Sequence, residues 1–207
     1  MAGPRSRATV PAMDEQQFFV EQHGLVETVV GDMVLGALSD QQLRCRPRPD
    51  QNSVAWLLWH AARWEDVIIS TWVAGRPQLF DLDGWSGRLG VATRHVGTAM
   101  TVAEAADLEG RIDLGALRAY AGAVWARTPE LVAWLPPSRL DEVVDAETLG
   151  RARRDGASAN ARAPWLDSFF ANRSRRFLIS FLNLHNAEHM IGEALAVRGQ
   201  GGFPLGL

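Results

Sequence analysis

Apolar side chains recur every three to four positions along four long stretches of the chain, which is the spacing of one face of an α-helix. The pattern predicts helices at about residues 13–38, 53–73, 114–135 and from 165 or 167 to 197. Alternating Val, Ile and Thr runs bounded by turn residues, the signal of strands, are missing. We therefore expect an all-α fold, an antiparallel four-helix bundle with one or two long connections.

Polar residues and prolines mark where several of these helices begin and end. Asn52 or Ser53 is a suitable N-cap for the second helix, and Asp113 for the third. The sequence "TVAE" at residues 101–104 has the capping-box pattern and predicts a short additional helix. Pro136 and Pro137 end the third helix. Residues 138–164 are weakly patterned, and both short strands and helical turns fit them.

Length and charge indicate a single domain of ordinary composition. We place it at residues 13–207, after a disordered N-terminal arm at residues 1–12. The formal net charge of −3 gives no sign of nucleic-acid or anionic-membrane binding. No uninterrupted apolar run approaches the roughly 20 residues of a membrane span, and the N-terminus lacks the apolar segment of a secretory signal. We therefore expect a cytoplasmic protein with neither nucleic acid nor membrane as a partner.

The residue types present narrow the chemistry. All 21 basic residues are arginine, which points to a GC-rich genome and excludes Schiff-base catalysis by a lysine. The single cysteine, Cys45, makes neither an internal disulfide nor a multi-cysteine zinc site. No phosphate-binding loop, dinucleotide-binding fingerprint or nucleophile elbow is present.

The stretch "LNLHNAEHMIGEAL" at residues 182–195 places titratable side chains in a helix that otherwise reads as apolar. At 100° per residue from Phe177, His185 lies at about 80° and His189 at about 120°. Glu188 lies at about 20°, in the middle of a stripe that includes Phe181. All three side chains are therefore predicted to face the core, where they need hydrogen bonds, charge partners or a metal.

Histidines four residues apart on one helical face can bind one metal ion together, but two ligands make a weak site. His60, in "VAWLLWHAARWED", lies at the edge of the apolar face of the second helix and is the best third ligand. His23 and His95 stand in less apolar surroundings. A hydrogen-bonded, metal-free core remains the alternative.

Two segments resemble the DinB-like superfamily of metalloenzymes, which includes the mycothiol-dependent maleylpyruvate isomerases. They are "NSVAWLLWHAARWED" at residues 52–66 and "FLNLHNAEHMIGEALAVRG" at residues 181–199. The resemblance implies a four-helix bundle whose metal is held by one histidine of the second helix and a pair of the last helix. Those positions are His60, His185 and His189 here. Some thiol-dependent relatives have glutamate where this chain has His185.

Three histidine ligands leave a coordination position open, as in catalytic sites. Zn or Ni fits such a divalent metal site best, while Fe or Mn also fits. The resemblance implies a transferase or isomerase that uses mycothiol as co-substrate on a small electrophile. The rival functions are a metal-dependent hydrolase and a non-catalytic, stress-related metal-binding protein.

Two further residues are candidates for roles beside the metal. Arg63 lies one turn from His60 and is a candidate for binding an anionic thiol or substrate, although an outward, solvated arginine fits equally. Glu188 is a candidate catalytic base or a hydrogen-bond acceptor for a ligand imidazole. The apolar bundle surface also leads us to expect a homodimer.

Overall fold

The computed structural model describes residues 14–36, 38–158 and 161–203, so the predicted arm at residues 1–12 lies outside the described residues. All regular elements in the described part are helical, apart from an isolated antiparallel bridge between Val143 and Ser174. The expected all-α fold is confirmed. Nowhere among the described residues is a helix both long and apolar enough to cross a membrane.

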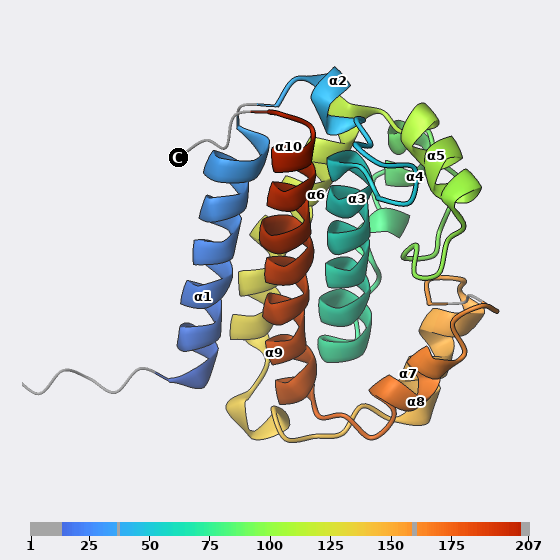
Figure 1. Ribbon diagram of the computed structural model, residues 1–207. Helices are drawn as coiled ribbons and strands as arrows, with labels where there is room; N and C mark the ends of the chain where they lie inside the picture. The colour runs from blue at the N-terminus through green and yellow to red at the C-terminus, as the bar shows by residue number, and fades with distance from the viewer. Residues whose placement is uncertain (1–13, 37, 159–160, 204–207) are drawn as a thin grey trace, which may run out of the picture.

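Four long helices form the bundle, and three of them change from α to π winding part-way along (Figure 1). They are α1 (Glu15–Val29) with η1 (Val30–Leu35), α3 (Val54–Glu65) with η2 (Asp66–Val73), α6 (Leu114–Trp134), and α9 (Arg175–Asn186) with η5 (Ala187–Glu193) and α10 (Ala194–Gln200). A π segment adds a residue to the turn and rotates the side chains that follow it. A helical wheel with a uniform step therefore assigns the wrong face to side chains that follow the π segment in three of the four helices.

Contacts at the helix ends fix the directions in which the helices run. The Gln16 side chain near the start of α1 donates to the carbonyl oxygens of Val132 and Leu135 at the end of α6, at 2.6 and 2.7 Å. Arg175 at the start of α9 donates to Val73 O at the end of η2, at 2.9 Å. The first and last helices thus run opposite to α3 and α6. Because α3 and α6 run in the same direction, the connection between them is long and is not a simple hairpin.

Short helices fill the connections between the long ones. They are α2 (Asp40–Leu43), η3 (Leu79–Asp81), α4 (Trp85–Leu89), α5 (Val102–Arg111), η4 (Pro137–Arg139), α7 (Ala146–Arg154) and α8 (Trp165–Phe170). Figure 1 shows α9 and α10 on one side of α3, with α4, α5, α7 and α8 on the other. The predicted caps are present: Ser53 starts α3, Thr101 and Glu104 form the capping box of α5, and Asp113 starts α6.

The predicted helix from residue 165 to 197 is wrong at its start. The short helix α8 ends at Phe170, and Asn172 takes a left-handed conformation with φ of 58°. The chain then restarts at α9, where the Ser174 hydroxyl accepts from the backbone N–H of Phe177 at 3.2 Å. Asparagine tolerates this conformation and serine is a favoured N-cap, so "NRS" was the signal of the break.

The helix formed by α3 and η2 is buried along its whole length. Trp59 is fully buried, and the connecting segment at Gly97 lies against its ring. Such a helix has no solvent-facing side, so each polar group on it requires a partner inside the protein.

Arg63 shows how this requirement is met. Its guanidinium donates to Tyr120 Oη at 3.0 Å, Gln78 Oε1 at 2.7 Å and Arg94 O at 2.8 Å, and it pairs with Asp66 at 3.3 Å. The side chain has no exposed surface. Both expectations for Arg63, a substrate contact and a solvated arginine, are therefore corrected: it is an internal structural residue.

Replacing Arg63 by methionine should lower the free energy of unfolding by about 3–5 kcal/mol, because Asp66 keeps a buried charge that has lost its cation. The matched change Arg111→Met breaks an exposed ion pair with Asp107 and should have a much smaller effect. Urea unfolding of both variants measures the difference. Equal effects of the two substitutions would contradict a structural role of Arg63.

Candidate metal centre

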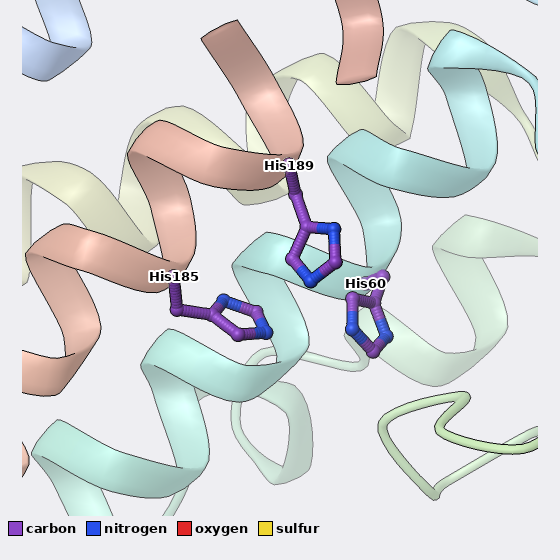
Figure 2. Close-up of side chains that lie close together, drawn as sticks. All are labelled: His60, His185 and His189. Carbon is purple, nitrogen blue, oxygen red and sulfur yellow. The ribbon is translucent and has the colours of Figure 1, made fainter. Parts of the chain in front are cut away.

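His60, His185 and His189 come together between α3 and the last helix (Figure 2). His60 projects from α3, His185 from the end of α9 and His189 from η5. The ring centroids are 5.2 Å apart for His60–His185, 4.9 Å for His60–His189 and 4.4 Å for His185–His189. One ring nitrogen of each lies within 4.8 Å of the other two, so a single ion can contact all three. The structure thus assembles the three histidines singled out from the sequence.

The partners of His60 define which of its nitrogens is free. Its Nδ1 lies 2.5 Å from Val96 O, and since a carbonyl oxygen only accepts, Nδ1 carries the proton. The Nε2 lone pair is then available to a metal. Trp56 stacks on the ring at 4.6 Å between centroids and 14° between planes. Burial, then the nearby His185 and His189, hold the pKa of His60 well below 6.5, so the ring is neutral as a ligand must be.

The other two histidines also have partners at Nδ1. His189 Nδ1 lies 3.2 Å from Glu193 Oε2, and the carboxylate accepts the N–H. His185 Nδ1 lies 3.5 Å from Asn186 Oδ1. Burial, reinforced by His189, lowers the pKa of His185 to about 3. Val96 O, Asn186 Oδ1 and the Glu193 carboxylate each favour the tautomer that carries its proton on Nδ1. Nε2 is then free on all three rings, and this donor set fits a divalent metal ion.

The three histidines form part of the wall of a cavity of about 350 Å³. The remaining wall is mostly aromatic and is contributed by α3, the segment before α5, α8 and α9. Its residues are Trp56, Trp64, Thr98, Ala99, Trp165, Leu166, Phe169, Phe170 and Phe181. The cavity gives a bound ligand access to the side of the cluster that the protein leaves open.

A known protein family matches the part of the chain that carries this site. The family model described as the DinB superfamily matches residues 32–191, which is more than half of the chain and includes all three histidines. The chain belongs to the DinB superfamily.

A solved structure has the same fold. The DinB-superfamily chain superposes on the "conserved protein of locus from Enterococcus faecalis" with a TM-score of 0.69 and 20% sequence identity. The similarity covers 91% of this chain and 98% of the other. At this identity it shows the fold and not the activity. A search of curated proteins finds no match.

Behind the cluster, this DinB-superfamily protein buries the carboxylate of Glu65, the last residue of α3. Glu65 Oε2 accepts from Asn186 Nδ2 at 2.6 Å, and Oε1 accepts from Thr128 Oγ1 at 2.5 Å. Because Asn186 directs its N–H at Glu65, its Oδ1 is the atom that faces His185. The Glu65–Asn186 contact therefore selects the His185 tautomer whose Nε2 can bind a metal.

His23 supplies the positive charge that Glu65 needs. Its Nε2 lies 2.7 Å from Glu65 Oε1 and its Nδ1 lies 3.2 Å from Glu27 Oε1. Burial works to lower the pKa of His23, but Glu65, with help from Glu27, raises it overall. The two carboxylates approach different ring nitrogens, which suits a doubly paired imidazolium better than a second metal ligand.

The expectation that Glu188 faces the core needs correction. Glu188 is exposed and lies outside the cavity wall, so it is not placed to act as a base there. Asn186, two residues earlier, is buried against Glu65. The carboxylate that supports a ligand histidine belongs to Glu193, which is exposed; its i,i+4 spacing from His189 was the available signal.

Exchanging Glu65 for glutamine should weaken zinc binding by about 10–100-fold. The new carboxamide can donate to Asn186 Oδ1, which lets the asparagine amide turn round and present its N–H to His185. Zinc competition titrations give the affinity, and ¹⁵N NMR of the apo protein gives the tautomer of His185. The control Glu27→Gln changes a partner of His23 that does not contact Asn186, and it should keep both values. An unchanged tautomer and affinity in folded Glu65→Gln would refute the role of this contact.

Proposed function

We propose that this DinB-superfamily protein is a metal-dependent enzyme that joins a low-molecular-weight thiol of the mycothiol type to a small electrophile, or uses that thiol to isomerise it. The observation that carries the proposal is the open side of the histidine cluster. Three imidazoles stand on the wall of a cavity of about 350 Å³. A metal site with three protein ligands and access to a cavity is typical of catalysis and not of a structural role.

His60, His185 and His189 would hold the metal, and their Nδ1 partners keep the rings oriented. A divalent ion bound by these residues would hold a thiol sulfur as thiolate at neutral pH. In a transfer reaction the sulfur forms a bond to the electrophilic carbon, and the leaving group departs with the bonding electrons of the bond that breaks. The thiol proton goes to water, because no carboxylate lies among the described residues of the cavity wall.

The proposal includes the identity of the metal and the setting of the reaction. Zinc and nickel suit an all-imidazole site, as iron and manganese also do. We place the protein in the cytoplasm, where thiols are kept reduced. The small-molecule substrate and the homodimer stay predictions.

The test compares metal-loaded protein, metal-free protein and His60→Ala with mycothiol and 1-chloro-2,4-dinitrobenzene, following thioether formation. Loaded wild type should turn over, while the other two should lose at least 100-fold in rate because the thiol is no longer held as thiolate. His95→Ala is the matched control, since this histidine lies outside the cluster and accepts from Gly97 N at 3.1 Å.

The outcomes separate the rival functions. Metal-dependent ester hydrolysis without thiol dependence would favour the hydrolase. Bound metal without turnover of the electrophile or of an ester would favour the non-catalytic metal-binding protein. Equal thioether formation in loaded wild type and His60→Ala would contradict the proposal.

A further inference from the structure

The cavity walls beside the histidines are made of aromatic rings in mutual contact. Phe169 and Phe170 meet edge to face at 4.9 Å between centroids, and Phe170 and Phe181 at 5.4 Å. Phe181 in turn lies 5.7 Å from the ring of His185. Trp56 extends the surface on the other side by stacking on His60. Aromatic rings therefore run continuously from the metal-binding nitrogens into the cavity.

The buried indole N–H groups of this wall already have partners. The indole N–H of Trp56 points to Met100 Sδ at 3.4 Å, and that of Trp64 donates to Thr98 Oγ1 at 3.1 Å. Among the described lining residues only the three histidines are titratable. Beside this wall, Arg162 donates to the backbone carbonyl of Ala99 at 3.0 Å and pairs with Glu104.

From this lining we infer that the cavity takes a flat, uncharged aromatic substrate. This inference deepens the proposed function, on which it rests, by naming the class of the substrate. Ring faces and edges pack favourably against another flat ring, and burying a further charged group without a partner is costly. A cationic ligand would also be repelled by a metal ion bound to the histidines.

Two hydroxamates that differ only in one group test the inference. Benzohydroxamate and acetohydroxamate chelate a metal in the same way, but only the first carries a phenyl ring. With zinc-loaded protein, calorimetry should give benzohydroxamate at least ten-fold tighter binding. Adding a charge in 4-carboxybenzohydroxamate should remove most of that advantage.

A pair of equally exposed tryptophans supplies the control. Trp165 lines the cavity and Trp134 stacks on Arg76 elsewhere, and each is 53% exposed, so neither change threatens the fold. Trp165→Ala should weaken benzohydroxamate three-fold or more and leave acetohydroxamate unchanged, whereas Trp134→Ala should affect neither.

The results distinguish this inference from the proposed function. Equal binding of benzohydroxamate and acetohydroxamate, or an undiminished affinity for the carboxylated compound, would overturn the aromatic substrate class and leave the metal site intact. Binding of neither hydroxamate to protein incubated with zinc would overturn the metal site and, with it, the substrate class.

Discussion

The burial of one helix on all sides is the constraint on which the rest of the structure depends. The helix formed by α3 and η2 has no solvent-facing side, yet it carries His60, Arg63, Glu65 and Asp66. A buried polar group without a partner costs roughly 1–3 kcal/mol, and a buried charge costs more. Each of these side chains must therefore be matched by a group on another element, and those matches decide how the elements assemble.

The partners of these buried side chains have different roles in the protein. Arg63 and Asp66 bind α6 and the segment that follows η2, so this pair fixes the architecture. Glu65 joins α1, α6 and the last helix through His23, Thr128 and Asn186. His60 faces the other way, toward the cavity, where its partners are two more histidines. The same requirement thus produces structural contacts behind α3 and a candidate metal centre in front of it.

Much of this could be predicted from the sequence, because local signals determine it. The helical period, the caps at Ser53 and Asp113, and the two histidine-bearing segments depend on short-range geometry or on a recognisable motif. The break before α9 was missed although Asn172 and Ser174 signalled it. The apolar period continues across the break, so only these two residues carry the signal.

The errors at Glu188 and Arg63 have another origin. On the last helix the buried face includes Leu178 and Leu182, while Leu184 is 67% exposed, so the apolar stripe used as the reference was not the core. Glu188 accordingly turned outward and Asn186 inward. The partners of Arg63 lie 15 and 57 positions away along the chain, and no helical periodicity reports contacts of that kind.

The central claim is that three imidazoles hold one metal ion at the cavity wall. Zinc K-edge X-ray absorption of the zinc-loaded protein tests it most directly. The account predicts one zinc per chain with three imidazole nitrogens at about 2.0–2.1 Å, one further light ligand from solvent, and loss of an imidazole in His189→Ala. A protein that retains no zinc, or a zinc shell without three imidazoles, would contradict it.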